Sequence, residues 1–500
     1  MNKILLYNPT SAIVKHRFPN AILNIAASIN GKYGWTIVDG NREEFPYEKI
    51  RSCLATGEFK YIGFTVMPGP QAKQAIPFAK KIKEEFPQTI MIWGGYFPTN
   101  HFKVVLTSGY VDFVVNGPGD HAFPRLIDAL ENNTPYELIK NIIYKTADNN
   151  VIKTIKEDLI EQDTLPELPY NQLNEIYPVE RYLGKTFLGN RTMAYHSSIG
   201  CPFTCSFCAV VPTYEARWKA KSAEHVYKDV KYIKDKWGAD AIEFHDNNFF
   251  VSEKRVVEFS KLIMPEKMNW WGMARIDTMD KFKDETLALI REAGCRIIFF
   301  GAESGNDKML KQMDKGGTQS GEQILRFAGR LKKYDLIPEY SFVLGMPAPT
   351  PEEVMAQIDF DINFIKQVKA VNPRTEIILY TYSPVATEGS DLYNNVLKMG
   401  FKYPKTLEDW ASPQWEGFDM RRNPLTPWLT PEMIDKIRNF ETVLNGYYPT
   451  VADIRLNGLK RKLMHLTAGL RYKASFYQYP YEIKALQRLW KYRQPEVQGF

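Results

Sequence analysis

Residues 192–208 read TMAYHSSIGCPFTCSFC and decide the fold, because an apolar run there leads directly into a cluster of cysteines. Met193–Ser198 has the character of a buried β-strand, and Cys201, Cys205 and Cys208 follow it with the spacing CxxxCxxC. Only five cysteines occur in 500 residues, which excludes a disulfide framework. The crowding of three of them predicts a metal or cluster site in a reducing compartment.

The number of cysteines separates two kinds of metal site. A structural zinc ion needs four closed ligands, and only His196 is a plausible fourth ligand to add to the three thiolates. A cubane iron–sulfur cluster held by three thiolates instead leaves one iron open, and an open iron can bind a chelating substrate. The sequence favours the cluster and leaves zinc as the alternative.

Beyond the cysteines, short apolar runs alternate with helical patterns as far as residue 400. Six such units predict an incomplete TIM-like barrel over residues 188–400, whose active site would gather at the C-terminal ends of the strands. One helix is expected to begin at Thr350, where Thr-Pro-Glu-Glu forms a capping box. The predicted strands are Met193–Ser198, Ala241–His245, Trp270–Ile276, Arg296–Gly301, Tyr340–Leu344 and Glu376–Tyr382.

Residues 1–140 contain another βα series. Its runs are apolar on both faces, which predicts an α/β domain with a parallel sheet, doubly wound in the flavodoxin manner. The expected strands are Ile4–Tyr7, Trp35–Val38, Tyr61–Val66, Ile90–Trp93 and Val111–Val115. The residues expected to face a ligand at the strand ends are Asn8, Asp39, Thr65, Gly94, Gly95, Gly117 and Gly119.

The remaining segments complete a three-domain organisation. Residues 141–187 read as a β-hairpin followed by a Pro-punctuated linker, and residues 401–500 as a mainly helical domain. Residues 451–500 hold ten Lys and Arg against three Asp and Glu, so the net charge of +6 is local to the C-terminus. In the same region, Leu459, Leu463, Leu466 and Leu470 recur at helical spacing.

Composition excludes several classes of protein. Hydrophobic residues at 44% and charged residues at 24% are typical of a folded enzyme. The longest apolar runs fall far short of the ~20 residues that a membrane-spanning helix needs. The N-terminal apolar run is too brief for a signal-peptide core, so a cytoplasmic location is expected.

These motifs together resemble the radical S-adenosylmethionine (SAM) superfamily over roughly residues 190–400. The resemblance implies that Cys201, Cys205 and Cys208 hold a 4Fe–4S cluster whose open iron binds SAM, and that reductive cleavage of SAM yields a 5′-deoxyadenosyl radical. It also implies SAM contacts from the strand ends: Phe207 and Val343 near the adenine, Asp246 and Asn247 near the amino group, Glu303 and Ser304 near the ribose and carboxylate, and Arg275 in the third-strand motif. His245 is interpreted as a core residue.

With the barrel so identified, residues 1–140 resemble the cobalamin-binding domain of one branch of this superfamily. Asp39-Gly40-Asn41 lacks the histidine of a familiar cobalamin motif, so no lower axial ligand is expected from there. Gly117-Pro118-Gly119-Asp120 departs from the usual Gly-Glu-Gly-Glu pattern of the branch. The alternative is a domain that binds no cofactor and only packs against the barrel.

The resemblance implies a cobalamin-dependent radical SAM methyltransferase that acts on an unactivated carbon. The alternatives are a cyclase or rearrangement enzyme like the anaerobic magnesium-protoporphyrin ester cyclase, and a non-catalytic cluster and cobalamin sensor. The expected partners are a small-molecule or lipid-like substrate and an external electron donor of the flavodoxin or ferredoxin type. The basic C-terminus suggests peripheral contact with a membrane surface, and no nucleic acid is expected.

Overall fold

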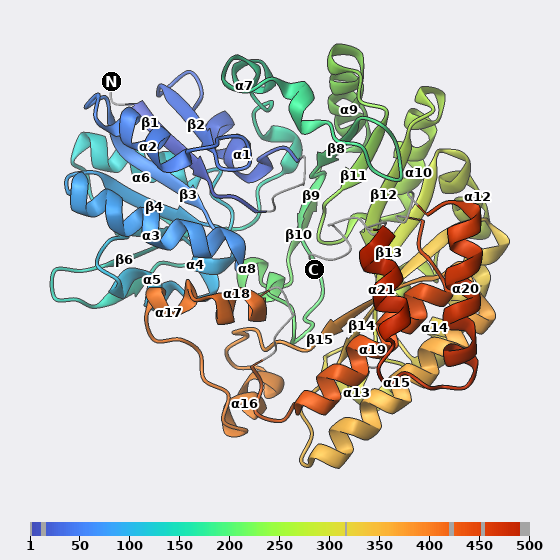
Figure 1. Ribbon diagram of the computed structural model, residues 1–500. Helices are drawn as coiled ribbons and strands as arrows, with labels where there is room; N and C mark the ends of the chain where they lie inside the picture. The colour runs from blue at the N-terminus through green and yellow to red at the C-terminus, as the bar shows by residue number, and fades with distance from the viewer. Residues whose placement is uncertain (1–2, 12–16, 316–317, 420–424, 452–455, 491–500) are drawn as a thin grey trace.

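The computed structural model describes residues 3–11, 17–315, 318–419, 425–451 and 456–490. The described strands form two large sheets and one small antiparallel pair. Figure 1 shows the N-terminal sheet, in blue, beside the green and yellow strands of the second sheet. This arrangement confirms the predicted α/β architecture of a doubly wound domain followed by a partial barrel.

The first sheet has the order β2-β1-β3-β4-β5-β6-β7. Its first five strands are parallel and have the flavodoxin-like order 2-1-3-4-5, while β6 and β7 form the antiparallel hairpin that extends the edge. The strands are β1 (Lys3–Asn8), β2 (Trp35–Asp39), β3 (Phe59–Thr65), β4 (Ile90–Gly94), β5 (Phe113–Val115), β6 (Ile142–Lys145) and β7 (Val151–Lys153). The helices are α1 (Asn20–Ile29), α2 (Pro46–Leu54), α3 (Pro70–Glu85), α4 (Tyr96–Asn100), α5 (Phe102–Thr107) and α6 (Ala122–Asn132).

The segment predicted as a linker has structure of its own. It forms η1 (Gln162–Thr164), α7 (Tyr170–Ile176) and η2 (Val179–Tyr182). Tyr182 donates a hydrogen bond to the buried carboxylate of Asp39 at 2.8 Å, and the hydroxyl of Tyr177 accepts one from the Asp39 backbone N–H at 3.3 Å. The linker therefore supports the end of β2.

The second sheet has six parallel strands in the order β15-β14-β13-β12-β11-β8, as expected for a partial barrel. The strands are β8 (Thr192–Tyr195), β11 (Ala241–Phe244), β12 (Asn269–Ala274), β13 (Cys295–Glu303), β14 (Ile337–Leu344) and β15 (Glu376–Thr381). Around them lie α9 (Ala223–Trp237), α10 (Glu253–Ile263), α11 (Ile276–Met279), α12 (Asp284–Glu292), α13 (Asp307–Gln312), α14 (Gly321–Lys333) and α15 (Pro351–Val371), with the turns η3 (Phe249–Val251) and η4 (Met264–Glu266). The helix expected at Thr350 is α15, and the Thr350 side chain accepts from the N–H of Glu353.

The predicted strand Met193–Ser198 was too long, and the predicted strand Trp270–Ile276 ran two residues past the end of β12 at Ala274. Met193–Ser198 is not continuous, because β8 ends at Tyr195 and a separate strand β9 (Ser198–Gly200) pairs antiparallel with β10 (Trp218–Ala220). Ser197 and Ser198 both donate to Asp246, and these hydrogen bonds fix the turn between the two strands. The apolar pattern of the sequence alone cannot show these hydrogen bonds to a distant aspartate.

The C-terminal region is helical, as predicted, and contacts both preceding domains. It contains α16 (Asp391–Lys398), α17 (Leu407–Trp410), α18 (Pro413–Asp419), α19 (Pro431–Tyr447), α20 (Gly458–Lys473) and α21 (Tyr481–Trp490). Trp410 of α17 packs against Phe97 and His101 of the N-terminal domain, where Figure 1 shows α17 beside α5. None of the helices in the described part of the chain has the length and apolar character needed to span a bilayer.

Candidate active site

The cysteine loop begins at a sharp backbone turn. Gly200, directly before Cys201, has φ +75°, and a Cβ there would lie 2.0 Å from the carbonyl oxygen of Arg217 on the way to β10. Only glycine fits this position without a shift of the backbone. The β9–β10 pair thus closes the base of the loop that carries the three cysteines, and the short helix α8 (Val210–Tyr214) follows them.

Cys205 is the buried cysteine of the three, whereas Cys201 and Cys208 are partly exposed. The predicted residue Arg275 lies directly beside it and donates from Nη1 to Cys205 Sγ at 3.0 Å. Two further N–H groups of this guanidinium donate to Asp277 at 2.9 and 2.7 Å, and its Cζ atom lies 3.9 Å from the ring centroid of Phe203. The structure therefore places a fixed positive charge against one thiol of the loop.

Among the described residues, no three Cys, His, Asp or Glu side chains are grouped as ligands of one metal ion. Burial raises the pKa of the Cys201 thiol, and a hydrogen bond from the backbone of Phe203 opposes this effect. Three thiols on one loop, with a guanidinium donating to one sulfur, fit the donor set of an iron–sulfur cluster, in which hydrogen bonds to sulfur are common.

The predicted residues at the end of β11 serve two purposes. The buried carboxylate of Asp246 accepts from the Ser197 N–H at 2.6 Å, the Ser197 hydroxyl at 2.5 Å and the Ser198 hydroxyl at 2.8 Å. Asn247 accepts a hydrogen bond at 2.9 Å from Tyr96 of the N-terminal domain. Asp246 thus supports the strand before the cysteines, and Asn247 joins the two domains.

The predicted residues at the end of β13 are held in a buried polar cluster. Glu303 has the left-handed φ of +65° and pairs with Lys315 at 3.0 Å, where both side chains are buried. Ser304 donates to Asp361, whose pKa burial raises to about 6. A non-glycine residue in this conformation is strained, and such strain is concentrated at functional sites.

The two remaining predicted barrel residues are apolar. Val343 lies buried in the core at the C-terminal end of β14, and Phe207 is half-buried in the cysteine loop. The Lys315 ammonium stands 6.0 Å from the centre of the Phe207 ring. The structure thus brings Phe207 close to the buried ion pair of Glu303 and Lys315.

A cavity of about 550 Å³ lies between the N-terminal domain and the barrel mouth. Six of the seven predicted N-terminal residues line it: Asn8, Thr65, Gly94, Gly95, Gly117 and Gly119. Asn247 lines the opposite wall. The C-terminal edge of the first sheet therefore faces the barrel, where a ligand of the first domain can reach the second.

The seventh predicted N-terminal residue, Asp39, does not line this cavity. Its buried carboxylate accepts from the Asn8 amide at 3.0 Å, from the Asn41 backbone and side chain at 3.0 Å, and from Tyr182. Asp39 therefore positions Asn8 and Asn41, which do line the cavity.

Several cavity residues escaped the sequence analysis. His245 was interpreted as a core residue, yet it lines the cavity and its Nε2 lies 3.0 Å from Glu243. Burial lowers the pKa of His245 to about 4, so this imidazole is neutral at pH 7. His196, offered as a fourth zinc ligand, lines the same cavity with its ring 6.2 Å from that of His245.

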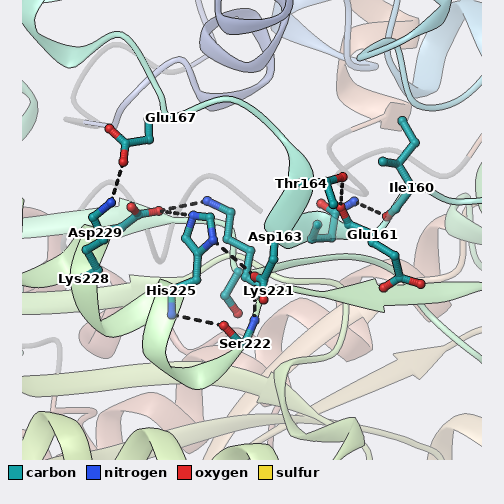
Figure 2. Close-up of polar contacts among 12 residues, drawn as sticks. Ile160, Glu161, Asp163, Thr164, Glu167, Lys221, Ser222, His225, Lys228 and Asp229 are labelled. Atoms are coloured by element: carbon teal, nitrogen blue, oxygen red, sulfur yellow. Dashed lines mark hydrogen bonds and ion pairs between the residues drawn. The ribbon is translucent and has the colours of Figure 1, made fainter.

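A further polar cavity residue is Lys221, which no motif indicated. Its ammonium pairs with Asp229 at 2.9 Å and donates to Tyr195 at 2.7 Å. Figure 2 shows His225 next to this pair, between Asp229 and Asp163 of η1. The network joins the linker, α9 and the cavity wall, and its members are too far apart in sequence to form a recognisable motif.

Acidic side chains lie on the barrel strands as well. Trp271 of β12 donates to Glu339 of β14 at 3.2 Å. Burial, with added repulsion from Glu376 and Glu243, raises the pKa of Glu339 to about 8. Glu339 is therefore mainly protonated at pH 7 and can donate a hydrogen bond.

Comparisons with known proteins agree with this geometry. Residues 195–360 match the model of the radical SAM superfamily. An uncharacterized methyltransferase of Pyrococcus horikoshii is 27% identical over 373 residues, 72% of this chain and 77% of the relative. The anaerobic magnesium-protoporphyrin IX monomethyl ester cyclase of Synechocystis is 25% identical over 440 residues, 83% of each chain.

Solved structures show that the whole fold is shared. The cobalamin-dependent SAM radical enzyme OxsB, with aqua-cobalamin and SAM bound, superimposes with a TM-score of 0.71 over 98% of this chain and 75% of that chain, at 14% identity. The radical SAM methyltransferase TsrM of Kitasatospora setae gives 0.67 over 98% of this chain and 99% of that chain, at 15% identity. With its three-cysteine loop at the mouth of a six-stranded partial barrel, the chain contains a region, residues 195–360, that matches the radical SAM superfamily.

Proposed function

We propose that this chain is a cobalamin-dependent radical SAM enzyme that transfers a methyl group to an unactivated carbon of a small molecule. The single observation that carries the proposal is the cavity shared by the glycine-lined edge of the first sheet and the barrel mouth. The methyltransferases among its relatives and the cobalamin-bound structures with its fold support the same conclusion.

The three cysteines would hold a 4Fe–4S cluster, which with bound SAM would supply the radical chemistry that removes hydrogen from carbon. Arg275 would neutralise charge on the Cys205 thiolate, and Asp246 would fix the strand that leads into the loop. For SAM itself we retain Phe207, Asn247, Glu303, Ser304 and Val343 as contacts. The Lys315–Glu303 pair would hold the Glu303 carboxylate in place.

For cobalamin, we propose contacts from the glycine-rich edge of the first sheet. A side chain at Gly119 would meet Ile25 at 2.7 Å, and Gly117 adopts φ +103° near the backbone of Thr213. These positions keep the cavity wall free of bulk, so that a flat ring can approach the backbone. Asn8 and Thr65 supply polar groups at the same edge, and Asp39 acts through Asn8.

The substrate and redox partner are a small molecule and an external reductant. We propose that the reductant is a flavodoxin or ferredoxin, and that the substrate is lipid-like or carries a large apolar part. A cytoplasmic location is supported by the five free cysteines. Peripheral contact of the basic C-terminal region with a membrane is a further part of the proposal.

A second candidate function is radical cyclisation or rearrangement without net methylation. It is favoured by the cyclase of Synechocystis, whose similarity extends over most of both chains. The two candidates share every residue named above for the cluster, SAM and cobalamin. They differ in the fate of the methyl group of SAM, which is retained in the product only by a methyltransferase.

The test is anaerobic reconstitution with iron, sulfide and cobalamin, followed by incubation with reductant and methyl-labelled SAM. We expect 5′-deoxyadenosine from the wild type and its absence from the triple Cys201→Ala, Cys205→Ala, Cys208→Ala variant. Label recovered in a product identifies a methyltransferase, and unlabelled product a cyclase. Equal 5′-deoxyadenosine from both proteins, or none from the wild type, would reject a radical SAM enzyme and favour a sensor.

A further inference from the structure

Helix α20 presents a continuous apolar stripe to the solvent. Leu459, Leu463, Leu466 and Leu470 are 79%, 46%, 69% and 79% exposed. At 3.6 residues per turn these four positions fall within about 60° of one another around the helix axis. Single exposed leucines are common on protein surfaces, but an aligned row of four marks an interaction site.

The stripe is not a result of loose packing, because the opposite face of α20 is well anchored. Met464, Ala468 and Tyr472 are buried on that face. The ring of Tyr472 stacks on Tyr447 of α19 at 4.8 Å, and a Cβ at Gly469 would lie 3.0 Å from the Tyr447 ring. The orientation of α20 is therefore fixed by α19, with the leucines directed outward.

The charge of α20 is of one sign. Its sixteen residues, GLKRKLMHLTAGLRYK, contain five Lys and Arg and no Asp or Glu. Lys462 and Lys473 are exposed and lie about 50–70° to one side of the centre of the leucine stripe. On the other side Lys460 lies about 90° and Arg471 about 110° from that centre, and Arg471 pairs there with Glu482 of α21. An apolar stripe between basic rows is the pattern of a helix that lies flat in an anionic membrane interface.

Large exposed apolar and aromatic side chains continue in the chain after α20. Phe476, Tyr479, Tyr481 and Leu489 are large and at least half exposed. Aromatic side chains of this kind prefer the headgroup region, where one end is apolar and the other is hydrated. They follow α20 directly in the chain and precede or belong to α21.

We propose that α20 docks this chain on an anionic lipid surface, with the leucine stripe inserted among the acyl chains and the lysines at the headgroups. A second copy of the chain is disfavoured as the occupant, because a two-fold contact through this stripe would set the lysine rows of both copies against each other. Sixteen residues span about 24 Å, so the helix lies in the interface plane rather than across the bilayer. The surface is separate from the cysteine loop and the shared cavity. The inference rests on the peripheral membrane contact included in the proposed function and deepens it, but it does not depend on the proposed reaction.

The experiment is flotation of the full-length protein with vesicles of phosphatidylcholine and phosphatidylglycerol in equal parts, beside vesicles of phosphatidylcholine alone. We expect the wild type to float with the anionic vesicles and to detach with added salt. The variant Leu466→Gln/Leu470→Gln should partition at least tenfold less. Lys462→Gln/Lys473→Gln should lose the preference for anionic lipid.

Leu138→Gln is the matched control, since Leu138 is 91% exposed but lies in the N-terminal domain. It should float like the wild type. All substituted side chains are exposed, and circular dichroism checks that each variant folds. Formation of 5′-deoxyadenosine in lipid-free solution tests the proposed function independently of lipid binding. Failure of the wild type to float, or equal flotation of the leucine variant, would overturn the proposal. So would a wild-type dimer in light scattering that the leucine substitutions dissociate.

Discussion

Replacement of Arg275 by glutamine tests the electrostatic role of the residue that touches the cysteine loop. The substitution removes a buried positive charge whose Nη1 lies 3.0 Å from Cys205 Sγ. It also removes an N–H donor to that sulfur. Both changes disfavour the reduced cluster, which carries one more negative charge than the oxidised cluster, so the reduction potential should fall.

The magnitude follows from the distances. Two unit charges about 4 Å apart interact by about 4 kcal/mol at an effective dielectric constant of about 20. The carboxylate of Asp277 lies 2.7 Å from the same guanidinium and offsets a large part of this interaction energy. The net interaction of Arg275 with the cluster is then roughly 1–2 kcal/mol. For a one-electron couple about 1.4 kcal/mol corresponds to ~59 mV, so we expect a decrease on the order of 60 mV.

Asp277→Asn provides a prediction of opposite sign. It removes the carboxylate that offsets Arg275 while leaving the guanidinium beside Cys205, so the potential should rise. Arg275→Lys keeps the charge without the planar fork and should recover part of the wild-type value. Arg330→Gln is the matched control, because Arg330 pairs with Asp284 on the outside of the barrel.

The assay is an anaerobic redox titration of the reconstituted cluster followed by electron paramagnetic resonance. Iron content is measured in every variant, so that loss of the cluster is not mistaken for a shift of its potential. An unchanged midpoint in Arg275→Gln at full iron content would refute the reasoning. A shift of both Arg275→Gln and Asp277→Asn in the same direction would do so too.

Three further predictions concern the cavity, the domain contact and the barrel interior. Gly94→Leu, which places a side chain at the cavity wall, should abolish cobalamin absorbance while the iron content stays that of the wild type; unchanged cobalamin binding would contradict the proposed site. Tyr96→Phe removes the hydrogen bond to Asn247 and should lower stability by about 1 kcal/mol in thermal unfolding, whereas an unchanged Tm would show that this bond does not hold the domains together. The pKa of Glu339 is raised from 4.5 to about 8. Between these two pH values the folded chain keeps a proton that the unfolded chain loses, so the stability should fall as the pH rises through this range. Glu339→Gln should accordingly raise the Tm more at pH 8 than at pH 5, and an equal effect at both pH values would argue against a buried protonated carboxyl.

The residue pattern was sufficient to predict the two sheets and the order in which their strands follow one another along the chain. Runs that are apolar on both faces, separated by helical segments, predict parallel buried strands, and the structure confirms both series. The error at Met193–Ser198 arose because Asp246, about fifty residues further along the chain, binds Ser197 and Ser198 and ends the strand early. A local pattern carries no information about such a distant partner.

The same limit explains the outcome for single site residues. Glycines at strand ends were located from sequence because their position relative to a strand is local, and four of them line the cavity. Asp39 was expected beside them, but its carboxylate is engaged by Tyr182 from the linker and by Asn8. His245 was assigned to the core, since nothing in the sequence shows that the end of β11 faces the first domain.

By itself, the sequence predicted the cysteine site of this protein, because the spacing of Cys201, Cys205 and Cys208 after a strand is a local property of the chain. It also determined that residues near Leu466 form a helix, since the leucines repeat with the helical period. Only the tertiary structure decided which way each side chain faces: that Arg275 meets Cys205, that two domains share one cavity, and that the leucines of α20 point outward. Those relations depend on contacts between segments far apart in sequence, which no local pattern encodes.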